Sequence, residues 1–515
     1  MMSSRLGIAA ILFAVADLAS AASFTVRDLE GIYNGRLSYG MLYRLGNRDR
    51  DLIAIASEGN ATTANTDDGN LNYGKGVVSN TVRAAGEVAL RWGDFGAYVR
   101  GSAFYDFENQ SSDPARTEFD SDAEKLVGSD IELRESYLNW RLRPGGVPVL
   151  LRVGQQIVNW SETTFVRDGL DIINPVDLVA VLQPASKRED LRTPQRMVWL
   201  AANITQTFSM EAYYQYEWEP VELPPVGWYF STNDAFGGEG LQSWMYGDGR
   251  TSDLGTDLDE RFQLPAGTLG FDEDFQRLPG FNRDKPSDNG QYGMALIGFL
   301  PDSNATKVGL HYMRYHSRLP VVMGRTGDAA AVAATAEPFV AARADALTSV
   351  YLEQGLDPAE AALLGREAAE EITLSRYANE ASYFVSYPED IDAFGLSFST
   401  STTRTGTLFA GEFTHHKDFP FQIALGPVFQ SVFSPVLFDP AVGDTVLGEF
   451  GPNEVIGGYS EHDRSLGTLE VGQIFRGRCW AVQVLLSADL SWAGVHDLPD
   501  DGEPGLTSDD EDSWG

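Results

Sequence analysis

The chain has 515 residues, of which 43% are hydrophobic and 22% are charged, a balance shared by many globular proteins. Its 74 acidic and 38 basic side chains give a formal charge of −36. Such an excess repels phosphate backbones, so we expect no nucleic-acid partner. It also argues against a basic patch for anionic lipids and fits a surface or lumen that attracts cations.

The N-terminus has the three parts of a secretory signal peptide. Arg5 supplies the basic region, residues 6–15 are apolar, and an A-x-A cleavage site ends at Ala21. We therefore predict a signal peptide over residues 1–21 and a mature start near Ala22. A buried N-terminal helix is the alternative interpretation.

The rest of the chain offers no run of 18 apolar residues, so a membrane crossing would have to use β-strands. The single cysteine, Cys479, can form neither an internal disulfide nor a thiolate metal site. We expect no cofactor and no metal centre.

Alternation of apolar and polar residues is the dominant pattern beyond the signal peptide, in runs of about ten residues. It predicts four clear strands, at 36–45, 82–92, 209–218 and 482–492. Trp92, Trp218 and Trp492 each close a run on its apolar face, as the aromatic girdle of a membrane barrel requires.

Weaker alternation predicts ten more strands. They cover residues 95–107, 131–142, 149–160, 197–205, 292–300, 306–316, 382–387, 393–400, 407–415 and 466–475. Gly93-Asp94 predicts a tight hairpin turn. Residues 46–79, 108–130 and 220–290 are long acidic connections, for which a solvated surface and a specific calcium site are both open interpretations.

Residues 329–377 break the β pattern, because they are rich in alanine and have helical periodicity. Val340, Ala344, Leu347 and Tyr351 share one helical face, and Asp357-Pro358 starts a second helix. We predict a helical hairpin inserted between strands, either as a plug or lid over the pore or as a decorative loop.

No residue pattern points to catalysis. His316 and Ser317 are adjacent, and adjacent strand residues point to opposite faces, so they cannot act as a base and a nucleophile together. The same argument applies to His415 and His416 as metal ligands, with Glu412 as the one acid nearby. We therefore expect no enzyme.

Several segments resemble the proteobacterial outer-membrane family catalogued as domain of unknown function 1302. They are residues 67–72, 95–101, 152–160, 169–177, 214–220, 230–234 and 315–320. The resemblance implies a large barrel that moves hydrophobic compounds across the outer membrane of a Gram-negative cell. It also implies lipopolysaccharide, outer-membrane lipids, periplasmic chaperones and the barrel assembly machinery as partners. Gln155 stands where the family pattern more often has arginine.

The predicted fold is all-β, a large antiparallel transmembrane β-barrel of roughly 14–18 strands when complete. Because residues 509–515 resemble a loop that enters a strand, we expect the chain to lack its closing strands. An acidic tail on a complete barrel is the alternative.

The predicted function is an outer-membrane channel or transporter for hydrophobic or small organic compounds. A barrel-embedded lipid hydrolase and a soluble secreted β-rich binding protein are the alternatives. Polar residues on the predicted strands would line the lumen and set selectivity by charge. The candidates are Arg83, Glu87, Arg91, Arg152, Gln156, Glu211, Gln215, Glu217 and Asp489.

Overall fold

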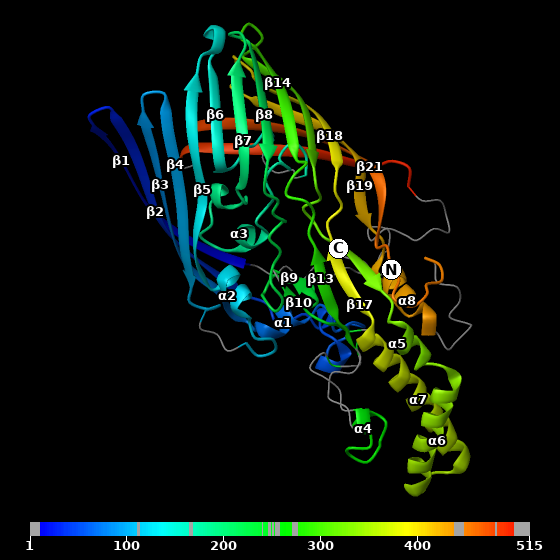
Figure 1. Ribbon diagram of the computed structural model, residues 1–515. Helices are drawn as coiled ribbons and strands as arrows, with labels where there is room; N and C mark the ends of the chain where they lie inside the picture. The colour runs from blue at the N-terminus through cyan, green and yellow to red at the C-terminus, as the bar shows by residue number, and fades with distance from the viewer. Residues whose placement is uncertain are drawn as a thin grey trace.

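A curved antiparallel sheet of fourteen strands dominates the computed structural model (Figure 1). The structure describes residues 11–110, 114–163, 168–238, 240–245, 249, 252, 258–269, 277–436, 447–478 and 481–498. Neighbours in the sheet follow chain order, so it is a meander with two large insertions. Cys479 and the acidic C-terminal segment 509–515 lie outside the described residues.

The strands of the large sheet are eight to twenty residues long. They are β1 (Ile11–Val26), β2 (Leu29–Arg44), β3 (Gly76–Trp92), β4 (Phe95–Asp106), β5 (Ser129–Leu142), β6 (Val149–Gln156), β7 (Gln195–Asn203), β8 (Phe208–Gln215), β14 (Tyr292–Leu300), β15 (Thr306–Tyr315), β18 (Ile391–Ser401), β19 (Leu408–Gln422), β21 (Tyr459–Arg478) and β22 (Ala481–Val495).

Alternation gives this sheet two chemically different faces. On β3, Val88 and Trp92 are exposed on the convex face, whereas Arg83 is buried on the concave face. Short turns join strands at one end, such as Gly93-Asp94 between Trp92 and Phe95, where Gly93 has φ 58°. All the long connections leave the other end of the sheet.

All fourteen predicted segments contain strands, and thirteen of these strands belong to the large sheet. The segment 382–387 is the exception, because β17 (Ser382–Ser386) pairs in a separate sheet of order β13-β17-β16-β20. The fourteenth strand of the large sheet is β1, which includes residues 11–21 of the predicted signal peptide. The signal peptide stays a prediction, and cleavage after Ala21 would leave Ala22–Val26 of this strand.

The prediction that Trp218 belongs to an exposed aromatic girdle is wrong. Strand β8 ends at Gln215, and the Trp218 side chain is buried against Tyr387, with its indole N–H donating to the Ser317 carbonyl oxygen. Trp92 and Trp492 are exposed as predicted. The alternation continued past Gln215 in the sequence, but the backbone leaves the sheet there.

The long connections build a second layer at their end of the sheet (Figure 1). Its short strands are β9 (Phe236–Gly237), β10 (Gly240–Leu241), β11 (Trp244–Met245), β12 (Arg277–Leu278), β13 (Gly280–Asp284), β16 (Val321–Arg325) and β20 (Val455–Ile456). Its short helices are α1 (Asp68–Asn72), α2 (Ser121–Val127), α4 (Leu258–Arg261), α5 (Ala329–Ala333) and α8 (Leu425–Val432). Among the described residues, no helix is long and apolar enough to cross a membrane.

Two long helices, α6 (Glu337–Glu353) and α7 (Pro358–Glu380), occupy the alanine-rich segment. The predicted apolar face of α6 is buried against α7 and against residues 258–269. Figure 1 shows both helices extending away from the large sheet. Whether the hairpin acts as a plug or lid over the pore or is a decorative loop stays a prediction.

Candidate functional site

The connection between β6 and β7 spans residues 157–194, and its described residues, 157–163 and 168–194, lie inside the concavity of the large sheet. We call it the inner connection; it includes α3 (Leu178–Leu182) and a 3-10 turn at Arg188–Asp190. Five of its apolar side chains belong to a buried cluster that also holds residues of β7, β8, β14, β15 and β18. The members from the inner connection are Val158, Trp160, Leu170, Ile172 and Ile173.

Ion pairs hold the inner connection to the wall formed by β2 and β4. Asp190, which is 1% exposed, accepts a hydrogen bond from Arg36 at 2.9 Å and another from Arg100. Glu189 beside it is 3.4 Å from Arg36, but its side chain is 61% exposed. A buried carboxylate between two guanidinium groups is a fixed electrostatic anchor.

Two further contacts extend this anchoring to β3 and β5. Arg83 donates to the side-chain oxygen of Gln183, and Arg134 lies 3.3 Å from an oxygen of Asp177. Burial raises the pKa of Asp177, and the charge of Arg134 acts in the opposite direction. Asp177 also caps α3 by accepting from the Ala180 N–H.

The opposite wall holds the other side of the inner connection. Trp160 donates to Glu211 of β8 at 2.8 Å, and Gln215 donates to the Ile173 carbonyl oxygen at 2.8 Å. Further contacts come from β15, β19 and β21. They are the ion pair of Lys307 with Glu162 at 2.5 Å, the Glu162 N–H donating to Glu412 at 3.3 Å, and Arg464 donating to the Asp168 carbonyl oxygen at 3.2 Å.

Glycine permits the backbone to approach at two places on the wall. A Cβ atom at Gly40 of β2 would lie 2.6 Å from the Ala185 nitrogen, and one at Gly395 of β18 would lie 2.3 Å from Leu170. Strands from β2 through β21 therefore contact one short segment of chain. Such a set of contacts requires the sheet to curve around the inner connection.

A cavity of about 410 Å³ remains between the inner connection and the wall. The wall contributes polar side chains from β3, β4 and β5, and the inner connection contributes both charged and apolar ones. The charged residues in its lining are Glu87, Arg100, Glu135, Asp171, Arg188, Glu189 and Arg192. The space accommodates a small organic molecule, and its lining carries charges of both signs.

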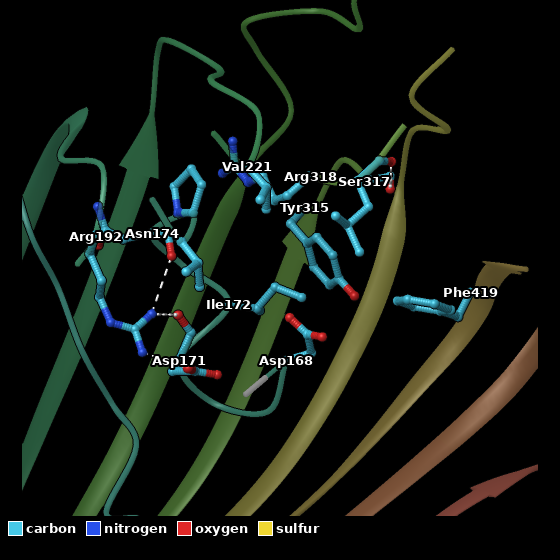
Figure 2. A pocket seen from close by; sticks show the side chains of 13 residues that line it. Asp168, Asp171, Ile172, Asn174, Arg192, Val221, Tyr315, Ser317, Arg318 and Phe419 are labelled. Carbon is cyan, nitrogen blue, oxygen red and sulfur yellow. Dashed lines mark hydrogen bonds and ion pairs between the residues drawn. The ribbon is translucent and has the colours of Figure 1, made fainter. Parts of the chain in front are cut away.

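A smaller cavity lies on the other side of the inner connection (Figure 2). Arg192 donates to the Asp171 carboxylate at 2.5 Å and to the Asn174 carbonyl oxygen at 3.3 Å, while Tyr315 and Phe419 approach from β15 and β19. Asp171, Val176 and Arg192 line both cavities. The Asp171–Arg192 ion pair therefore stands between the two spaces.

The family model described as "Protein of unknown function (DUF1302)" matches residues 2–515. The chain belongs to the DUF1302 family. The resemblance found in the sequence is thereby confirmed over the whole chain. No curated protein matches it by sequence.

The solved structures that match this DUF1302 chain have low sequence identity and low structural similarity to it. The outer membrane channel DcaP of Acinetobacter baumannii is 7% identical, with 92% of this chain and 82% of that chain covered and a TM-score of 0.32. The ferric-catecholate import receptor Fiu from E. coli K12 is 9% identical, with coverages of 96% and 60% and a TM-score of 0.30. The copper transporter OprC is 8% identical, with coverages of 94% and 61% and a TM-score of 0.25. This likeness is too slight to carry an inference.

Several predicted lumen residues of this DUF1302 chain face the inner connection. Arg83, Glu211 and Gln215 contact it directly, as described above, and Glu87 lines the larger cavity. Gln156 is fully buried and donates to the Met197 carbonyl oxygen. Their role in selectivity stays a prediction.

The remaining candidates lie away from the inner connection. Arg91 is near the short-turn end and 3.7 Å from Glu30, and Arg152 stacks over the rings of Tyr137 and Trp199. Asp489 of β22, an outermost strand of the sheet, is paired in register with Glu470 of β21. Glu217 lies past the end of β8, where it pairs with Arg196 at 2.7 Å, so its predicted place on a lumen strand is wrong.

Sequence reasoning missed the residues of the inner connection itself. Asp171, Asp177, Asp190 and Arg192 lie in what the sequence presents as a polar loop. The family resemblance had singled out residues 169–177 without giving any of them a role. The apolar group Leu170, Ile172 and Ile173 among these charges was a further signal, because a solvated loop has no need of it. Gln155, noted for its departure from the family pattern, donates to the Leu133 carbonyl oxygen at 3.3 Å.

Proposed function

We propose that the chain is an outer-membrane channel for small organic solutes, in which the inner connection sets the size and charge of what passes. The observation that carries this proposal is the binding of residues 157–194 to strands from β2 through β21. A segment tied across a curved sheet, with a cavity left beside it, restricts a passage without blocking it.

An apolar belt on the convex face supports a place in a membrane. Its exposed apolar side chains lie on strands from β3 to β22, and soluble monomers rarely expose so large a contiguous apolar surface. Aromatic side chains stand at both ends of the belt, with Trp92, Phe95 and Trp140 near the short turns and Trp492 near the long connections. Between them, the exposed members include Val99, Leu138, Leu310, Phe394, Leu396, Phe413, Leu469 and Leu490.

The strands at the two ends of the sheet each have one edge without a partner strand among the described residues. Within the described residues, β1 pairs with β2 alone and β22 pairs with β21 alone. An unpaired peptide group in lipid costs several kcal/mol. Cleavage after Ala21 would remove most of β1 and make β2 the first strand of the sheet. We therefore propose that β2 and β22 acquire partners in the membrane, which makes the functional form a closed barrel.

The charges around the larger cavity bear on the substrate. Because Arg188 and Arg192 lie opposite Glu87 and Glu135, the cavity suits solutes that carry ionic groups. We propose small organic ions as the substrates to test first, ahead of the hydrophobic compounds that the family resemblance implies. Export through the predicted signal peptide, assembly by the barrel machinery and contact with lipopolysaccharide complete the proposal.

A charge placed on the convex belt tests the membrane location. Leu310, 56% exposed in the middle of β15, is paired in register with Leu396 on β18. If this face meets lipid, Leu310→Arg loses about 2–4 kcal/mol of stability near the bilayer midplane. The measurement is the folded fraction in outer membranes, read from the shift of the gel band on heating.

The matched control is Leu352→Arg, on an equally apolar residue that is 44% exposed at the end of α6. It lies outside the belt, so we expect a change within about 0.5 kcal/mol. Equal tolerance of both variants, or a wild-type protein found in the soluble fraction, would favour a secreted binding protein instead.

A lipid hydrolase is the second candidate function, and one cluster favours it. On the convex face, Ser465 Oγ lies 3.0 Å from His415 Nδ1 and 2.9 Å from His496 Nε2, and His415 Nε2 lies 3.5 Å from Asp463. The sequence had offered no such set. Transport remains our proposal, because the Ser465 side chain is 3% exposed and its hydroxyl group is shared between two imidazoles.

A comparison of the wild-type protein with its Ser465→Ala variant tests whether the protein hydrolyses lipids. We expect purified protein to release no more fatty acid from phospholipid vesicles than its Ser465→Ala variant does. A serine-dependent release would replace the channel proposal with an acyl hydrolase that uses Ser465 as its nucleophile and His415 as its base.

A further inference from the structure

Two connections far apart in the sequence bring three carboxyl groups together at the long-connection end of the sheet. Asp67 and Asp68 lie between β2 and β3, and Asp234 lies between β8 and β14. One oxygen atom of each lies within 4.8 Å of the others. All three residues are buried, with exposed fractions of 0% for Asp67, 4% for Asp68 and 8% for Asp234.

Hydrogen bonds account for only part of the oxygen atoms in this cluster. Asp234 Oδ2 accepts from the N–H groups of Asp67 at 2.8 Å and Asp68 at 3.3 Å, and Asp67 Oδ2 accepts from the Ala54 N–H at 2.9 Å. Within the described part of the chain, Asp67 Oδ1 and Asp234 Oδ1 are buried and have no hydrogen-bond partner. A buried acceptor without a partner is costly, and more so when it carries charge.

The charges of the cluster are also unbalanced. Arg116 lies 3.2 Å from Asp68, and Thr117 donates to the same carboxylate. That guanidinium group can neutralise one of the three negative charges. Burial raises the pKa of Asp67, and burial together with the charges of Asp68 and Asp67 raises that of Asp234. The site therefore needs either a bound proton or a bound cation.

We propose that Asp67, Asp68 and Asp234 form a site for one divalent cation, of which Ca²⁺ fits best. The donors are all carboxylate oxygens, which favour hard cations over zinc or copper. Ca²⁺ accepts irregular sets of carboxylate and backbone oxygens, whereas Mg²⁺ demands a near-octahedral arrangement. The unpartnered oxygen atoms of Asp67 and Asp234 supply the direct ligands.

Bound in this position, the cation joins two connections that already contact each other. The Asn65 side chain pairs with the backbone of Met245, and the Asp234 N–H donates to the Asn65 carbonyl oxygen at 2.7 Å. The cation thus fastens the β2–β3 connection to the β8–β14 connection at the mouth of the sheet. The site is separate from the inner connection and does not depend on the channel proposal.

The test is a calorimetric titration of Ca²⁺ into the full chain, purified in detergent and stripped with a chelator. We expect the wild-type protein to bind one Ca²⁺ and to resist proteolysis better with Ca²⁺ present. Asp234→Asn keeps the side chain's shape and its acceptor for two N–H groups, yet we expect its affinity to fall about tenfold or more. Asp302→Asn, on an exposed aspartate in the turn between β14 and β15, is the matched control and should bind as the wild type does.

A shared proton is the outcome that would overturn the proposal. In that case the wild-type protein binds no Ca²⁺, and Asp234→Asn is at least as stable as the wild type, since asparagine mimics a protonated aspartate. The wild-type titration decides the matter even if the variant does not fold.

Discussion

Replacement of the inner connection by a short turn is expected to raise solute flux several-fold. Gln156 at the end of β6 and Gln195 at the start of β7 are direct partners in adjacent antiparallel strands, so a two-residue hairpin turn can join them. The replacement removes the segment that lies across the concave face. The wall side chains that contacted this segment are then exposed to water. Conductance in planar bilayers and swelling of liposomes measure the effect.

The helical hairpin provides a control of the same design. Arg325 of β16 and Ser382 of β17 are also direct antiparallel partners, so residues 326–381 can be replaced by the same turn. Because α6 and α7 extend away from the sheet, we expect this variant to conduct as the wild type does. Unchanged conductance after removal of the inner connection, in a protein that still inserts, would contradict our account of the passage.

Loss of the Asp190 carboxylate is expected to release the inner connection from its wall. Asp190→Ala leaves the buried Arg100 without its closest partner and removes the 2.9 Å contact of Arg36. Removing one member of a buried ion pair costs about 3 kcal/mol or more, because a charge stays behind without compensation. Urea unfolding measures the loss, and faster proteolysis near residues 187–192 locates it.

Glu189→Ala is the matched control, one residue away. Its carboxylate is mostly exposed and 3.4 Å from Arg36, so we expect a loss below about 1 kcal/mol. If both variants lose the same free energy of unfolding, the buried Asp190 carboxylate does not anchor the inner connection.

Much of the large sheet could be predicted because period-two alternation is a local property of the sequence. The runs around Val88 and Leu490 carry their two faces in their own residues. The predictions for Trp218 and for β17 were wrong for the same reason. Alternation shows that a segment has two faces, but it does not show which sheet the segment joins or which partner buries one of its faces. The faces of α6 and α7 were likewise readable, whereas the direction in which they project was not.

The candidate site was less accessible to sequence reasoning because its parts come from distant positions. Arg83 and Glu211 were identified as lumen residues from their strands, but the partner of Arg83, Gln183, lies in a segment without periodicity. The partner of Glu211, Trp160, closes a predicted strand whose observed counterpart, β6, already ends at Gln156. A loop folded into the concavity depends on long-range packing, which no local pattern encodes. The same holds for Asp234, which is 166 positions from Asp68 in the sequence.

A single-thiol measurement tests most directly whether the passage runs beside the inner connection. In a Cys479→Ser background, Arg188→Cys places a thiol on an exposed residue that lines the larger cavity. Asp302→Cys, in the exposed turn between β14 and β15, is the control. We predict that a bulky thiol reagent irreversibly lowers the current through the Arg188→Cys channel alone. A current that the reagent leaves unchanged in both variants, or a protein that carries no current, would contradict the account.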